Sequence, residues 1–149
     1  MRTLRTVTAV FVLSVVGGLP AANAQGSKKA QEERGSAGSG AVERGKYIVE
    51  GVAMCGRCHT PNNVAGENDN RNTLLGGPAQ IQPTYQVPNW AVIEPRIAGA
   101  PPLTDAQFIR LMTTGITRTG LPPNPPMPRF HMTRADAEAV LAYLKSLKE

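Results

Sequence analysis

Cys55-Gly56-Arg57-Cys58-His59 is the stretch that decides how this 149-residue chain folds. It places two thiols three positions apart, with an imidazole directly after the second. This C-x-x-C-H pattern is the signature of covalent haem c attachment. Thiols at this spacing can reach the two vinyl groups on one edge of a porphyrin, and the adjacent imidazole then falls under the iron. The stretch therefore predicts one haem c, joined to Cys55 and Cys58 by thioethers and ligated by His59.

Two other chemistries use paired thiols. A redox dithiol of the thioredoxin type follows a strand, and nothing before Cys55 reads as a strand. A zinc site needs a fourth ligand. His131 is the second of the two histidines in the chain, and using it would force the adjacent Cys58 and His59 onto one metal. The motif favours haem over both alternatives.

The composition agrees with a core that a large ligand helps to fill. Hydrophobic residues make up 41% of the chain, but aromatic residues make up only 5%. The 15 Gly and 13 Pro residues predict long ordered loops. Such loops are uncommon in a small domain, unless they wrap a ligand. Two Cys residues exclude a disulfide-rich scaffold and a four-thiolate zinc or iron–sulfur site within the chain.

The first 24 residues have the organisation of a secretory signal peptide. Arg2 and Arg5 precede an apolar run of 13 residues, and Ala22-Asn23-Ala24 offers a small-x-small cleavage site before Gln25. A bilayer-spanning helix needs about 20 residues, so the run is short for an anchor. We therefore expect a cleaved leader, a periplasmic mature protein and no stable membrane span.

Residues 25–41 contain no aromatic or branched apolar side chain, which predicts a flexible tether. The folded domain is then 42–149. The whole chain carries a net charge of +5, but 11 basic and nine acidic residues leave this domain at only +2. Because its basic residues are scattered, we expect no nucleic-acid partner.

Helical periodicity appears in three parts of this domain. One runs from Val42 to about Met54. Another covers residues 104–114, with a Thr104–Gln107 capping box at its start and Gly115 as its stop. The last covers residues 133–148, with Thr133 as N-cap. Few or no strands are expected between them, so the predicted fold is all-α, with three or more helices and long ordered loops.

The chain resembles class I c-type cytochromes over about Val42 to Leu147. The resemblance rests on Gly45-Lys46-Tyr47 before the motif, Met127-Pro128 with Phe130, and the ending Ala142-Tyr143-Leu144-Lys145-Ser146-Leu147. Within that family it is most similar to cytochromes that serve periplasmic dehydrogenases. The resemblance implies a cytochrome c fold around one haem, with the first and last helices crossing where Gly45 meets Tyr143.

The resemblance also implies that Met127 is the second axial ligand of the haem iron. Met127 lies in a stretch with five prolines in seven residues, 122–128. Prolines fix φ and lower the entropy of the free loop, which helps to hold a weak thioether ligand. Met132 and His131 are the alternative ligands, and a Met127 that simply packs on the core is the structural alternative.

Three further assignments concern the surroundings of the haem. Gly77-Pro78 resembles the family's Gly-Pro, whose carbonyl accepts the N–H of the iron-bound histidine. Trp90 and Arg96 suit the anionic haem propionates. The alternatives are a simple turn, a core Trp and a solvated Arg. Core or haem-pocket positions are expected at Leu74, Leu75, Ile81, Val87, Ile93, Ile97 and Leu103.

These features predict a one-electron carrier rather than an enzyme, because ligation by His and Met leaves no free coordination site. We expect a periplasmic dehydrogenase as electron donor and an oxidase or another cytochrome as acceptor. Two alternatives stay open. The chain could be a cytochrome subunit fixed in a dehydrogenase complex, or a haem enzyme or gas sensor with a displaceable distal ligand.

Overall fold

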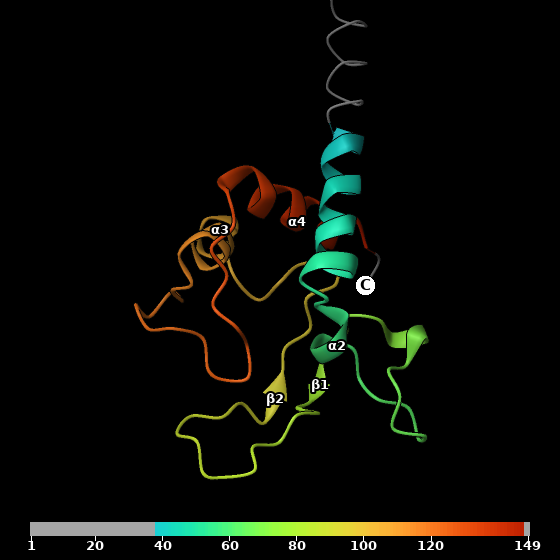
Figure 1. The fold of residues 1–149 in the computed structure, drawn as a ribbon. Helices are drawn as coiled ribbons and strands as arrows, with labels where there is room; N and C mark the ends of the chain where they lie inside the picture. Colours follow the sequence, from blue (N-terminus) through green and yellow to red (C-terminus); the bar gives the residue numbers. More distant parts are fainter. Residues whose placement is uncertain (1–37, 148–149) are drawn as a thin grey trace, which may run out of the picture.

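Helices at the two ends of the domain frame the structure, and long loops connect the elements between them (Figure 1). The computed structural model describes residues 38–147, so the leader expected over 1–24 lies outside the described residues. Of the expected tether, residues 38–41 are described, and they are helical. Ala41 and Val42 are half-buried, and Val42 packs against the core.

The N-terminal helix widens before it ends. Residues 38–46 are α-helical and continue directly into the π-helical segment η1 (Tyr47–Val52), which buries Ile48 and Val49. The amide of Ala53 then donates to the Ile48 carbonyl at 2.7 Å. Met54 takes a left-handed conformation, with φ of 48°. This break turns the chain into the short helix α2 (Gly56–His59), which carries most of the cysteine motif.

The other two helices begin and end where their capping residues predict. Helix α3 (Asp105–Thr114) opens with the Thr104–Gln107 capping box and stops at Gly115, whose φ is 65°. Helix α4 (Arg134–Ser146) starts with Thr133, whose hydroxyl accepts the Asp136 amide. Helix α3 packs on α4, and α4 packs on η1. The core lies between them and includes Ile48, Val49, Phe108, Leu111, Met112, Val140, Leu141 and Leu144.

The predicted crossing of the first and last helices is confirmed. A Cβ atom added to Gly45 would lie 2.0 Å from the Ala139 carbonyl oxygen and 2.7 Å from the Tyr143 Cβ. The Tyr143 hydroxyl donates to Glu50 at 2.5 Å and ties the two helices together near this contact. A hydrogen atom is therefore the largest substituent that fits at Gly45.

Two very short strands join the central loops. β1 (Gly77–Pro78) pairs antiparallel with β2 (Ile93–Glu94), so that Gly77 lies opposite Glu94. The expectation of an all-α fold with few or no strands is correct, because the strands are only two residues long. They nevertheless fix the positions of the residues that follow β2.

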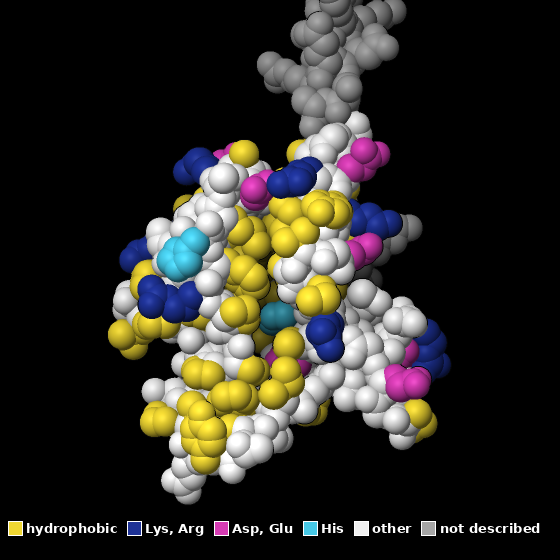
Figure 2. Space-filling model, in the orientation of Figure 1, with side chains coloured by type: hydrophobic (Ala, Val, Ile, Leu, Met, Phe, Trp, Pro, Cys, Tyr) yellow, Lys and Arg dark blue, Asp and Glu magenta, His cyan; other side chains and the backbone are white. Residues whose placement is uncertain are grey.

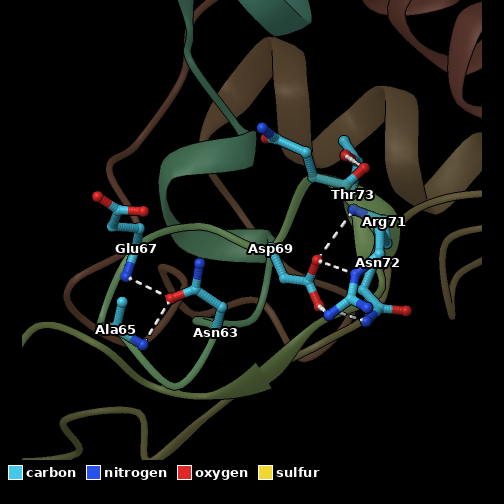
Figure 3. A network of polar contacts seen from close by, with 8 residues as sticks. Asn63, Ala65, Glu67, Asp69, Arg71, Asn72 and Thr73 are labelled. Carbon is cyan, nitrogen blue, oxygen red and sulfur yellow. Dashed lines mark hydrogen bonds and ion pairs between the residues drawn. The ribbon is translucent and has the colours of Figure 1, made fainter.

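The loop after α2 is ordered by its own polar side chains (Figure 3). The side-chain oxygen of Asn63 accepts the amides of Ala65 and Glu67, and Asp69 accepts the amide and guanidinium of Arg71. These bonds hold the loop and the short helix η2 (Asn70–Asn72) in place, although the loop buries little apolar surface.

Two further bonds attach this loop to α2. The Asn68 side chain donates to the Gly56 carbonyl at 2.6 Å, and the buried Thr60 hydroxyl accepts the Leu74 amide at 3.0 Å. Leu74 is 1% exposed and anchors the end of the loop in the core.

Within residues 38–147, no helix has both the length and the apolar character needed to cross a bilayer.

The helix crossing makes Gly45→Ala destabilising, even though alanine ordinarily favours a helix by about 1 kcal/mol over glycine. Its methyl group would meet the Ala139 carbonyl, and overpacking of this kind costs about 1–3 kcal/mol. Thermal melting followed by circular dichroism should show a lower Tm. Gly51→Ala is the matched control, because its Cβ would stay 3.7 Å from the Tyr47 ring. A Gly45→Ala protein that melts no lower than wild type would contradict the crossing.

Candidate functional site

One turn of helix carries both thiols and the imidazole of the motif. In α2, the amides of Cys58 and His59 both donate to the Cys55 carbonyl, at 3.3 and 2.9 Å. Cys55, Cys58 and His59 all line the same cavity, whose volume is about 510 Å³. This volume falls within the range of about 300–1,000 Å³ that is usual for ligand and cofactor sites.

The walls of this cavity are mostly apolar. Figure 2 shows hydrophobic side chains gathered around a hollow, with a histidine and an acidic side chain visible inside it. Contributions come from α3, α4, the segment around β2 and the proline-rich loop. The apolar lining includes Ile93, Ile97, Leu103, Phe108, Leu111, Met112, Phe130, Val140 and Leu144. A hydrophobic planar group fits such walls, and they would shield it from water.

His59 is held in the orientation that a metal ligand needs. Its Nδ1 lies 2.7 Å from the Pro95 carbonyl oxygen. Because a carbonyl can only accept, Nδ1 carries the proton and Nε2 keeps its lone pair. Burial lowers the pKa of His59, and the bond to Pro95 opposes this only in part. The neutral imidazole that iron requires is therefore the favoured form.

Pro95 thus takes the role that the sequence analysis gave to Pro78, and that assignment is wrong. Gly77 and Pro78 form β1, and Pro78 is exposed opposite Ile93. Gly77 and Pro78 act indirectly. They pair with β2, and this pairing places Pro95, the residue directly after β2, against His59. The carbonyl that accepts the His59 N–H therefore belongs to the segment after β2. Local sequence around His59 does not reveal this pairing.

Gly76 holds the segment after β2 close to the end of α2. Its φ is +73°, and its amide donates to the His59 carbonyl at 2.7 Å. A Cβ here would lie 2.4 Å from the Arg96 nitrogen and 2.5 Å from the Glu94 carbonyl oxygen. Glycine is required both by the left-handed backbone and by this close approach. Residues 74–77 and 94–97 are consequently locked together beneath the imidazole.

The two thiols are protonated at neutral pH. Burial raises the pKa of Cys55 to about 11. Burial also raises the pKa of Cys58, with a further contribution from the negative charge of Glu94. His131, the fourth ligand of the zinc alternative, is not in the lining, and residues 38–147 hold no metal-binding cluster of three or more His, Cys, Asp or Glu.

Met127 lines the same cavity as the motif, although 68 positions separate it from His59. Its loop is fastened by the Ala91 amide, which donates to the Pro125 carbonyl at 2.7 Å, and by a turn from the Met127 amide to Asn124 at 3.2 Å. Met132 also lines the cavity. The structure therefore brings together the motif and both candidate methionines.

Trp90 and Arg96 do not line the cavity, so the structure gives no support to their assignment to the propionates. The Trp90 indole donates to the Ile81 carbonyl at 2.8 Å and closes the loop between the strands. Arg96 donates to the Ala98 carbonyl at 2.9 Å. Arg118, which the sequence analysis did not single out, does line the cavity.

Of the apolar positions expected in the core or pocket, some are buried or line the cavity, and the others are not. Leu74 and Ile97 are buried, and Ile93 and Leu103 join Ile97 in the cavity wall. Leu75 and Ile81 are instead 36% and 48% exposed, which contradicts the expectation for them. Val87 is half-buried in the loop between the strands and is not part of the wall.

The helical frame, the cysteine motif and the apolar cavity define a haem-binding electron-transfer domain. Residues 42–148 match the Cytochrome c family, and the chain belongs to that family. A 36-residue stretch is also 56% identical to a diheme cytochrome c-type protein of Cereibacter sphaeroides. That match covers 24% of this chain and 12% of the relative, so the chain spans only a small part of the relative's length.

Replacing Gly76 should disturb the His59 site more than replacing another glycine of the same conformation. Gly66 also has a positive φ, of 80°, but nothing lies within 4 Å of its added Cβ. Gly66→Ala should therefore lower stability only by the left-handed strain of about 1–2 kcal/mol. Gly76→Ala should add an overpacking cost of about 1–3 kcal/mol. Chemical denaturation would compare the two, and equal losses would mean that residues 74–77 and 94–97 are not in close contact.

Proposed function

We propose that this cytochrome c carries one electron at a time on a single haem c, with thioethers to Cys55 and Cys58 and with His59 and Met127 as axial ligands. The observation that carries the proposal is the cavity itself. Residues from the motif and from the distant proline-rich loop line one apolar space of about 510 Å³. When bound, haem supplies a reversible one-electron change at its iron.

The surrounding residues each have a defined part in this function. Cys55 and Cys58 fix the haem edge, and the Pro95 carbonyl holds His59 toward the iron. The bonds at Pro125 and Met127 limit the motion of the distal loop. Ligation by His and Met completes the coordination of the iron, which favours electron transfer over substrate chemistry.

The proposal extends to compartment and partners. The leader-like sequence supports export, with cleavage between Ala24 and Gln25 and a periplasmic mature protein. The resemblance to cytochromes of periplasmic dehydrogenases supports a dehydrogenase as electron donor and an oxidase or second cytochrome as acceptor. Native co-purification from membranes and periplasm would separate a free carrier from a subunit fixed in a dehydrogenase.

Covalent attachment has a direct test on denaturing gels. The wild-type band should stain for haem, because thioethers survive denaturation, and a variant with both Cys55→Ala and Cys58→Ala should not stain. Met127→Ala is the matched control, since it removes a cavity residue without touching the thioethers, and its band should keep the stain. A folded wild-type protein without haem on the gel would refute the proposed function.

The distal ligand has a spectroscopic test. The oxidised wild-type protein should show the weak near-red charge-transfer band of methionine bound to ferric iron. Met127→Ala should abolish the band and open the reduced iron to carbon monoxide, whereas Met132→Ala should keep it. Loss of the band only in Met132→Ala would transfer the ligand to that residue. Rapid carbon monoxide binding by the wild type would favour the sensor alternative.

A further inference from the structure

Glu94 is a buried carboxyl group inside the cavity, and the function described so far does not use it. The residue is only 5% exposed and lines the same space as Cys55, Cys58 and His59. Neither of its carboxylate oxygens, Oε1 and Oε2, has a hydrogen-bond partner. Native structures seldom leave buried polar atoms in this state, so such a group calls for an explanation.

The backbone leaves Glu94 little freedom to withdraw. It lies in β2 opposite Gly77, and its carbonyl oxygen sits against Gly76. The next residue, Pro95, is bonded to His59, and the Ile97 amide donates to the Leu74 carbonyl at 2.9 Å. The carboxyl group is therefore held at the cavity by the same backbone contacts that orient the His59 imidazole.

An ionised carboxylate is expensive to bury, and such groups respond by taking up a proton. Burial raises the pKa of Glu94. The backbone amide of Gln80 is too poorly aligned to form a hydrogen bond with the carboxylate, and it opposes this rise only in part. This carboxyl group is therefore easier to protonate than an exposed glutamate.

Few other ionisable groups face this carboxyl. Among the described residues that line the cavity, Glu94 is the acidic one, and Cys55, Cys58, His59 and Arg118 are the other ionisable side chains. Cys58 and Glu94 interact electrostatically. With haem bound as proposed above, both thiols are consumed as thioethers and both nitrogens of His59 are engaged. Among the protein side chains that line the cavity, Glu94 then remains as the acidic one that can gain or lose a proton.

We propose that Glu94 is a proton site coupled to electron transfer, which binds a proton when the haem centre is reduced and releases it on oxidation. This inference rests on the proposed function. The one-electron donor supplies the electron, solvent supplies the proton, and the new O–H bond forms at a carboxylate oxygen of Glu94. Each reduction then adds one negative and one positive charge to the cavity, so its net charge does not change.

The coupling follows from charge interaction in a medium of low dielectric constant. The ferric centre carries one more positive charge than the ferrous centre and so favours the carboxylate. Linkage is reciprocal, so the ionised carboxylate favours the ferric state by the same factor. The reduction potential should therefore fall as pH rises between the two pKa values of Glu94, one for each oxidation state.

Potentiometric titration of the haem-loaded protein from pH 5 to 9 tests this. In wild type, the equilibrium constant for reduction should fall by up to tenfold per pH unit within the coupled range, or about 59 mV for a one-electron couple. Glu94→Gln should lose this slope, because glutamine resembles the protonated acid and cannot titrate. Its potential should match wild type at low pH and lie above it at high pH.

Glu67→Gln is the matched control, because it removes the same charge from an exposed side chain and should keep the wild-type slope. A flat wild-type profile, or an equal slope in Glu94→Gln, would overturn the inference. Haem staining separates this result from failure of the proposed function, since that failure would leave no haem to titrate.

A measurement on wild type alone decides the matter if Glu94→Gln does not fold. Infrared difference spectra should show a protonated-carboxyl C=O band that appears on reduction and shifts when the glutamates are isotopically labelled. Absence of such a band across the same pH range would overturn the inference.

Discussion

The hydrogen bond from His59 to the Pro95 carbonyl is the constraint on which the arrangement of the site depends. It spans 2.7 Å and joins the end of α2 to the segment after β2. One such bond adds only about 0.5–1.5 kcal/mol of net stability, so its importance lies in orientation. It selects the imidazole tautomer and turns Nε2 toward the cavity. The two short strands and the left-handed Gly76 bring the Pro95 carbonyl to the Nδ1 atom of His59.

The cavity depends in turn on how closely the terminal helices approach. Because Gly45 has no side chain, the first helix lies directly on Ala139 and Tyr143 of α4. That contact sets the position of α4, and α3 packs on α4 to complete the wall. The largest fully buried side chains, Leu74, Leu144 and Val49, are aliphatic and come from three distant parts of the chain. The core is therefore built around one side of the cavity, which agrees with a chain that has few aromatic residues.

Local signals in the sequence are sufficient to predict α3, α4 and the cysteine motif. Thr104, Thr133 and Gly115 mark helix ends through bonds to neighbouring residues, so their effect can be read without the fold. Pro95 could not be found in this way, because its role follows from a two-residue strand pairing that produces no alternation in the sequence. Burial of Glu94 likewise depends on tertiary packing.

The same distinction applies at other positions. Residues 38–41 carry no pattern of a buried helix, yet they are part of the N-terminal helix, and only Ala41 among them is half-buried. Met127 and Met132 both line the cavity, so the proposed ligation by Met127 rests on the family resemblance, since neither sequence spacing nor the cavity wall distinguishes the two residues. The amphipathic indole of Trp90 suits a haem propionate, but in the fold it donates to the Ile81 carbonyl and closes a loop.

The two sides of the cavity differ in how they are held, and this sets the order in which the protein opens. His59 lies in a helix braced by strands, whereas Met127 lies in a loop secured by a few isolated bonds such as that from Ala91 to Pro125. Segments with few buried contacts open with the lowest free energy, as amide hydrogen exchange reveals. We therefore expect the methionine side to open more readily than the histidine side. With haem bound as proposed, thermal fluctuation would release that side first, while thioethers to Cys55 and Cys58 and the His59 ligand would keep the haem in place for reclosure.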